Sequence, residues 1–200
     1  MTRSFSVTWD YRCPFARIGH EHILAGLAAG ADWDVRFVPF SLDQAHVSEG
    51  GTSVFDEPDR YPGLIANLAG VAVRDCWPDQ FTAAHGALFH ARHAESLDLR
   101  DRSIVAKVLD GAGLDAGAVL SEVDSGRPLA TLEREHTEAV ERWQVWGVPT
   151  FIVGESAVFV RLMKGPDGDP SRSVTAVERI YDQITGWPEL NEFKHTSLSN

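Results

Sequence analysis

Residues 1–40 restrict the fold more than any other part of the chain, because strand, helix and strand patterns follow one another there. Apolar side chains recur at every second position in residues 5–9, FSVTW, which predicts a strand. Residues 14–29 then carry apolar positions at roughly helical spacing and end at Gly30, which suits the position just past a helix. Residues 34–39 alternate again. The three segments together predict a βαβ unit with parallel strands and a right-handed crossover.

A single cysteine, Cys13, stands between the first strand and this helix. Pro14 follows it and suits the first helical turn, where a missing N–H has no intrahelical partner to lose. We therefore expect Cys13 at a helix N-terminus, where free N–H groups and the helix dipole favour negative charge. Because the thiolate is the nucleophilic form, this position predicts a lowered thiol pKa and a reactive cysteine. A buried structural cysteine is the alternative.

Composition limits the class of protein. The chain has 200 residues, of which 44% are hydrophobic and 24% charged, as expected of one globular unit with room for an inserted lobe. The net charge of -11 argues against nucleic acid as a partner. No apolar run reaches the length of a membrane span, and too few residues precede the first strand for a signal peptide. We expect a cytoplasmic protein in which Cys13 and Cys76 stay reduced.

The remaining elements follow in a clear order. Residues 46–63 are rich in Gly, Pro and acidic residues, which predicts a long surface connection. Residues 64–126 contain helical patterns only, and a further helix is predicted from 128 to Gly147. Two strands joined by a turn at Gly154 come next, and residues 170–186 predict a last helix.

A strand ending in DYRCPFA, a long helical segment, and WGVPTF leading into a hairpin and a final helix together resemble the thioredoxin-like DsbA family. Within it, the chain is most similar to cytosolic actinobacterial members, which include mycothiol-dependent reductases, and to the related kappa-class glutathione transferases and 2-hydroxychromene-2-carboxylate isomerases. The resemblance implies an α/β thioredoxin-like fold with an all-helical insertion. Residues 1–45 and 128–186 would form the thioredoxin-like domain, 46–127 the insertion and 187–200 a C-terminal tail.

The resemblance also implies where the site lies. Pro149 would be a cis-proline facing Cys13, and the backbone of Val148 would pair with a bound thiol substrate as an added strand would. Arg17 would stabilise the thiolate or bind a carboxylate of the bound thiol. The other residues expected to bind substrate or thiol around Cys13 are Tyr11, Arg12, Pro14, Phe15 and Thr150.

One departure from the family pattern changes the expected chemistry. Redox members carry Cys-x-x-Cys, whereas the fourth position here is Ala16, so no disulfide can form within the motif. Cys13 can still form a mixed disulfide, which an external thiol must then release. We expect a monothiol oxidoreductase or thiol-dependent reductase that uses a low-molecular-weight thiol, mycothiol or glutathione, as cosubstrate and a disulfide or electrophilic second substrate. Cys76 is expected to be buried and structural rather than a resolving thiol.

Two other functions remain open at this stage. In the first, Cys13 positions and ionises a bound thiol without forming a disulfide, as in a kappa-class transferase or isomerase. In the second, the chain is a thioredoxin-like binding protein that has lost the chemistry. The sequence therefore predicts a thiol site without deciding what that site does to the thiol.

No tightly bound cofactor or metal is expected. His85, His90 and His93 match no zinc spacing and are predicted to be partly exposed, near the cleft between the lobes. GPDGDP, residues 165–170, lacks the bidentate glutamate of a calcium loop and predicts a turn. His22 is expected to be a hydrogen-bonded core residue.

The C-terminal tail carries three apolar residues at helical spacing. They could dock on the body of the protein or on a second subunit, which would make a homodimer, and they are Trp187, Leu190 and Phe193.

Overall fold

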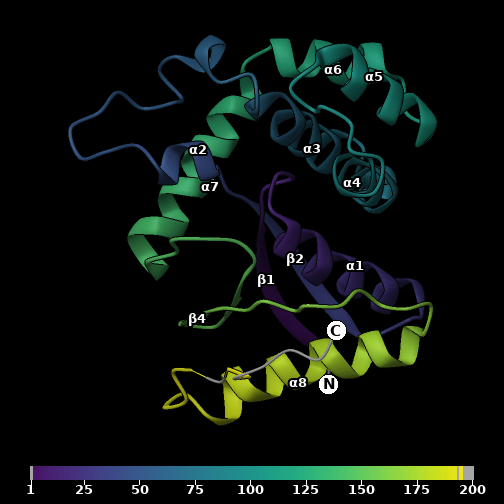
Figure 1. The fold of residues 1–200 in the computed structure, drawn as a ribbon, viewed down its shortest axis with the longest axis vertical. Helices are drawn as coiled ribbons and strands as arrows, with labels where there is room; N and C mark the ends of the chain where they lie inside the picture. The colour runs from purple at the N-terminus through teal and green to yellow at the C-terminus, as the bar shows by residue number, and fades with distance from the viewer. Residues whose placement is uncertain (1, 193, 196–200) are drawn as a thin grey trace.

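The computed structural model describes residues 2–192, 194 and 195. Its centre is a four-stranded sheet in the order β2-β1-β3-β4, formed by β1 (Arg3–Trp9), β2 (Trp33–Pro39), β3 (Thr150–Val153) and β4 (Ser156–Phe159) (Figure 1). β1 pairs parallel with β2 and antiparallel with β3, and β3 pairs antiparallel with β4. The predicted βαβ unit and hairpin are confirmed.

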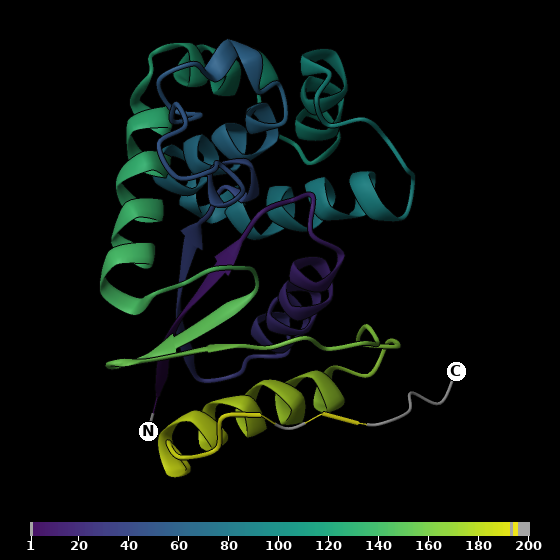
Figure 2. The same ribbon diagram turned by 60° about the vertical axis from the view of Figure 1, so that its left-hand side comes forward.

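Three long helices surround the sheet. α1 (Pro14–Ala28) and α8 (Pro170–Gly186) pack together on one side of β1, and α7 (Arg127–Trp143) runs along the other side (Figure 2). Asp169 caps α8 by accepting hydrogen bonds from backbone N–H groups of its first turn. The GPDGDP segment is therefore a turn that leads into a helix cap, as predicted.

The insertion is helical from its first long helix onward. α3 (Leu64–Cys76), α4 (Pro78–His93), α5 (Arg102–Gly111) and α6 (Ala116–Asp124) gather beyond one end of the sheet (Figure 1). They share one hydrophobic core with the sheet. Within the described residues, no helix is long and apolar enough to cross a bilayer.

A buried ion pair fastens the insertion to α7 and to the sheet. Arg74 of α3 donates two hydrogen bonds to Glu135 of α7, at 2.8 and 2.9 Å, and a third to the carbonyl of Phe37 on β2, at 2.8 Å. The planar guanidinium makes this forked geometry possible. Three elements that are distant in sequence thus meet at one side chain.

One sequence prediction about connections is confirmed in its main point and another was wrong. Residues 46–63 form a mostly exposed connection, as predicted, but they contain η1 (Pro58–Arg60) and bury Val54 and Phe55, which anchor the connection in the core; the short helix α2 (Leu42–Ala45) comes just before it. α7 ends at Trp143 rather than near Gly147, because the next residue, Gln144, takes a left-handed conformation with φ 53°. That turn buries the Val145 side chain, and the backbone N–H of Val145 donates to the carbonyl of Ala139 near the end of α7.

The tail does not continue as a helix through its described residues. Trp187 is 59% exposed and Leu190 is 37% exposed. Phe193, the third residue of the predicted apolar set, lies outside the described residues. The predicted docking of the tail stays a prediction.

Close packing of α1 on β2 generates a stability prediction. A Cβ on Gly26 would lie 2.3 Å from the ring of Trp33, which is itself buried. Gly26→Ala should therefore lower the free energy of unfolding by about 1–3 kcal/mol, the usual cost of overpacking a filled core. Urea unfolding measures the change. Gly111→Ala is the control, because no atom lies within 4 Å of the added methyl group; equal losses in both variants would contradict the packing argument.

Candidate active site

Cys13 is the N-cap residue of α1, as predicted. Its backbone is extended, with φ -86° and ψ 117°, and its Sγ atom accepts a hydrogen bond from the N–H of Ala16 at 3.5 Å. On the opposite side the thiol donates to the carbonyl oxygen of Val148 at 3.2 Å. The side chain is half-buried. The sulfur therefore lies between the first turn of a helix and a loop that leads into β3.

The predicted lowering of the Cys13 pKa is wrong for this structure. Burial raises the pKa of the thiol above its usual value, and the nearby carboxylate of Asp10 adds to the effect. Backbone N–H groups of Ala16 and Phe15 act in the opposite direction without overcoming burial. A thiol that donates to a carbonyl is protonated, so the hydrogen bond to Val148 agrees with this direction.

Neither flanking arginine is paired with the thiol. Arg12 forms ion pairs with Asp43 at 2.7 Å and with buried Asp10 at 3.3 Å. Arg17 forms an ion pair with Glu21, one turn further along α1, at 2.6 Å. Both guanidinium groups are thus held by carboxylates of the protein, and neither supplies an unpaired positive charge beside the sulfur.

The loop opposite Cys13 contains a cis peptide bond between Val148 and Pro149, as the family resemblance implied. The Pro149 ring packs against α1 at Gly19, where a Cβ would lie 3.2 Å from it. Thr150 is buried: its N–H donates to the Thr8 hydroxyl at 2.9 Å, and its own hydroxyl donates to the Gly147 carbonyl at 2.8 Å. Thr150 consequently holds the loop in place and presents no free hydroxyl to a substrate.

Tyr11 was expected to border the site, but it is buried under the insertion. Its N–H donates to the Asn67 side chain at 3.2 Å, and its carbonyl accepts from His93 Nε2 at 2.9 Å. Its hydroxyl bonds to His85 Nδ1 at 2.7 Å. The three partners belong to α3 and α4. Every polar group of Tyr11, two residues before Cys13, is therefore held by the helical insertion.

A chain of buried hydrogen bonds continues from Tyr11. His85 Nε2 lies 2.9 Å from His20 Nδ1, and His20 Nε2 lies 3.1 Å from the carbonyl of Thr8. A carbonyl can only accept, so His20 must donate through Nε2, His85 must donate to His20, and Tyr11 must donate to His85. Both imidazoles are neutral in this arrangement. Burial accordingly lowers the pKa of His20 to about 4 and that of His85 well below its usual value.

The prediction that His85 is partly exposed was wrong, because its side chain is fully buried. His22 is a core residue, as predicted, and bonds to the Ser173 hydroxyl at 3.0 Å and to the Lys164 carbonyl at 2.9 Å. The described residues contain no cluster of side chains suited to a metal ion. No sequence pattern predicts this series of hydrogen bonds, because only the packing of α4 on α1 brings its members together.

Cys76 is exposed at the end of α3, which overturns the prediction of a buried structural cysteine. α3 lies against Tyr11 at Gly70, where a Cβ would be 2.5 Å from the tyrosine oxygen. Cys76 is six residues further along, about 9 Å down the helix axis. Its charged surroundings, Glu122 and Arg127, share no residue with those of Cys13.

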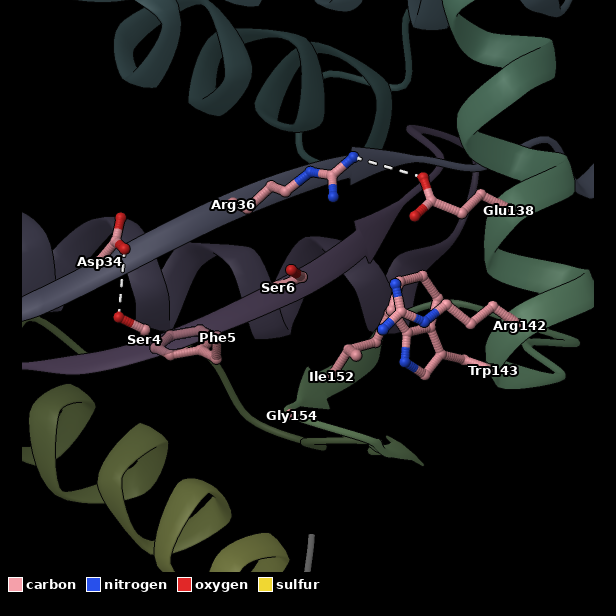
Figure 3. Close-up of a pocket in the computed structure, with 10 residues that line it drawn as sticks. All are labelled: Ser4, Phe5, Ser6, Asp34, Arg36, Glu138, Arg142, Trp143, Ile152 and Gly154. Carbon is pink, nitrogen blue, oxygen red and sulfur yellow. Dashed lines mark hydrogen bonds and ion pairs between the residues drawn. The ribbon is translucent and has the colours of Figure 1, made fainter.

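A cavity of about 280 Å³ lies elsewhere, over the sheet beside α7 (Figure 3). None of the predicted site residues lines it. Polar groups that line it pair with one another: the Ser4 hydroxyl donates to Asp34 at 3.2 Å, and Arg36 lies 3.8 Å from Glu138. The cavity is therefore separate from the thiol site.

The strand order, the helical insertion between β2 and β3, and a helix-capping cysteine opposite a cis-proline loop define a thioredoxin-like protein with an inserted helical lobe. The chain belongs to the DSBA-like thioredoxin domain family, which it matches over residues 6–164. None of the curated proteins compared with the chain matches it significantly.

Solved structures share the fold at low sequence identity. Pseudomonas aeruginosa DsbA is 19% identical to this chain, with a TM-score of 0.59; the match covers 94% of this chain and 86% of the DsbA chain. A 2-hydroxychromene-2-carboxylate isomerase is 18% identical, with a TM-score of 0.60; the match covers 92% of this chain and 98% of the isomerase chain. A probable DsbA oxidoreductase from Streptomyces coelicolor is 16% identical with a TM-score of 0.60, covering 96% and 93%. The helical insertion is thus part of a fold that redox and isomerase proteins share.

The raised pKa of Cys13 predicts how its reactivity depends on pH. In a Cys76→Ser background, the rate of alkylation by iodoacetamide should keep rising above pH 8.5, about the ordinary cysteine pKa, since only the thiolate reacts. Mass spectrometry of the alkylated peptide gives the rate at each pH. A midpoint below about 8.5, the ordinary cysteine pKa, would contradict the dominance of burial over the helix N-terminus.

The Tyr11 hydroxyl predicts a second measurable effect. Tyr11→Phe keeps the ring but leaves His85 Nδ1 buried without a donor, which costs about 1–3 kcal/mol. Urea unfolding should show a loss of that size, whereas Tyr61→Phe serves as the control because no hydrogen bond of the Tyr61 hydroxyl occurs among the described residues. A Tyr11→Phe protein as stable as wild type would refute the assigned proton order.

Proposed function

We propose that this protein is a monothiol thiol-disulfide oxidoreductase of the DsbA-like family, with Cys13 as its nucleophile. The observation that carries the proposal is the position of Cys13: its sulfur caps α1 and lies 3.2 Å from the Val148 carbonyl, beside the cis-proline loop. An extended substrate backbone could pair there with Val148 while its sulfur meets Cys13.

The surroundings of Cys13 indicate where the thiol that resolves its mixed disulfide would come from. Ala16 stands where a second cysteine of the motif would stand, and it is fully buried. Cys76 lies at the far end of α3, in different surroundings. The proposed resolving group is therefore an external low-molecular-weight thiol, mycothiol or glutathione, in a compartment that keeps thiols reduced, such as the cytoplasm.

The proposed cycle has two balanced exchanges. Cys13 loses its proton to solvent, and the thiolate attacks one sulfur of a substrate disulfide; a new disulfide to Cys13 forms, the old bond breaks, and the other half leaves as a thiolate that takes up a proton. A thiolate of the external thiol then attacks the substrate sulfur of the mixed disulfide and releases Cys13. The Ala16 and Phe15 N–H groups stabilise the transient thiolate.

One observation also favours a second candidate function. Cys13 is a protonated hydrogen-bond donor in this structure, so it could donate to the sulfur of a bound thiolate in place of Val148. In that role it would lower the pKa of the bound thiol without covalent change, as a thiol transferase or isomerase requires.

Trapping the mixed disulfide tests the two candidates. The Cys76→Ser protein would be incubated with glutathione disulfide and with mycothiol disulfide and then analysed by mass spectrometry, with a Cys13→Ser protein as control. An adduct on Cys13 that free thiol removes supports the oxidoreductase. Tight thiol binding without an adduct favours the transferase or isomerase, and neither binding nor adduct leaves a binding protein without thiol chemistry.

Ala16→Cys is the matched variant for the same experiment. The Ala16 N–H is 3.5 Å from the Cys13 sulfur, within the first turn of α1, so a cysteine there should form an internal disulfide on mild oxidation. Its disulfide reductase activity should then proceed without mycothiol or glutathione when another electron donor reduces the dithiol. Two free thiols in the variant after oxidation would contradict the placement of Cys13 at the start of α1, and a wild-type protein that needs no external thiol would contradict the monothiol cycle.

A further inference from the structure

Three aromatic rings and one cation gather near Cys13; Trp146 and Arg161 are exposed, and the two phenylalanines are half-buried. The group consists of Phe15, Trp146, Phe159 and Arg161, which we call the aromatic–cation platform. Trp146 packs on Phe159 with ring centroids 4.5 Å apart and is still 69% exposed. The Arg161 guanidinium lies over Phe15 at 5.2 Å and over Phe159 at 5.8 Å. Large aromatic surface left open to solvent beside a reactive group is unusual and indicates a binding function.

Backbone contacts fix the platform to the thiol site. Phe15 is two residues after Cys13, and its N–H acts on the Cys13 sulfur. Phe159 pairs with Thr150 across the hairpin, and the next residue, Val160, donates its N–H to the Pro149 carbonyl at 3.1 Å. The platform residues therefore belong to the two segments that flank the thiol site, the start of α1 on one side and the hairpin on the other.

Arg161 differs from the other arginines of the site. Arg12 and Arg17 are held by carboxylates, whereas Arg161 forms no ion pair with any residue that the structure describes. The carboxylate of Glu192 is bonded to Lys194 at 2.9 Å, and this bond, with a further contribution from Arg161, lowers the pKa of Glu192. The two aromatic faces hold the Arg161 guanidinium in place without neutralising it. It is the cation of the site that is available to an incoming anion.

We propose that the aromatic–cation platform selects acidic disulfides whose flat or apolar part covers Trp146 while a carboxylate meets Arg161. This inference rests on the proposed function, because it concerns the substrate that Cys13 attacks. The positive charge of Arg161 offsets, at this point of the surface, the overall negative charge of the protein, which otherwise repels acidic substrates. The role that the sequence suggested for Arg17, binding a carboxylate of the substrate, passes to Arg161.

Two aromatic disulfides of different charge test the proposal. Dithiobis(nitrobenzoate) carries carboxylates, and dithiodipyridine is uncharged at neutral pH; both release a coloured thiol when Cys13 attacks them. The rates would be measured by stopped flow in the Cys76→Ser background, each variant being compared with its parent for the same probe, so that the intrinsic reactivities of the probes cancel.

Arg161→Gln should slow the anionic probe about fivefold, the factor for two unit charges about 4 Å apart in water, and change the neutral probe less than twofold. Arg161→Lys keeps the charge and should recover most of the lost rate. Arg179→Gln removes the same charge from α8 and should leave both probes unchanged. Trp146→Ala should slow both probes, since both lose the exposed ring. High salt should abolish only the advantage of the anionic probe.

Two outcomes would overturn the inference in distinguishable ways. If Arg161→Gln slows both probes equally, or neither, Arg161 does not select charge although Cys13 attacks disulfides as proposed. If the folded Cys76→Ser parent reacts with neither probe while the same protein reacts when denatured, the proposed function fails and the substrate selection fails with it.

Discussion

The three hydrogen bonds that the insertion makes to Tyr11 are the interaction on which the site depends. These bonds involve the N–H, the carbonyl and the hydroxyl of Tyr11, and they fix the backbone just before Cys13. The sheet fixes the other side of the sulfur through Val148 and Pro149. Because the insertion holds Tyr11 while the sheet holds Val148 and Pro149, the position of the thiol depends on how the two lobes pack. The insertion is thus part of the active-site scaffold and not only a cover over it.

The electrostatics of the site follow from this arrangement. Burial favours the neutral thiol, while a helix N-terminus favours the thiolate, and burial is the larger effect. In the proposed function, a substrate that takes the place of the Val148 carbonyl beside the sulfur would remove one contact that favours the protonated thiol. Under that proposal, Cys13 would react after a substrate has docked.

Local patterns were enough to predict most of the fold. Alternation gave β1 and β2, the Cys-Pro junction gave the start of α1, and the two family motifs gave the cis-proline opposite Cys13. The failures all concern what long-range packing decides. Burial of Cys13, exposure of Cys76 and the pairing of Arg17 with Glu21 depend on neighbours that only the folded lobes supply. The end of α7 was missed because Gln144 takes a left-handed conformation that glycine or asparagine usually marks.

The buried chain from Tyr11 to Thr8 has a consequence for how the protein can evolve. Each member fixes the proton of the next, so a replacement at Tyr11, His20 or His85 leaves a neighbouring donor or acceptor without its partner. A single substitution at one of these positions therefore lowers the stability of the protein even when the new side chain fits the space. The three positions, separated by up to 74 residues in the sequence, should therefore covary among relatives: they are retained as a set or exchanged together for apolar side chains of similar volume.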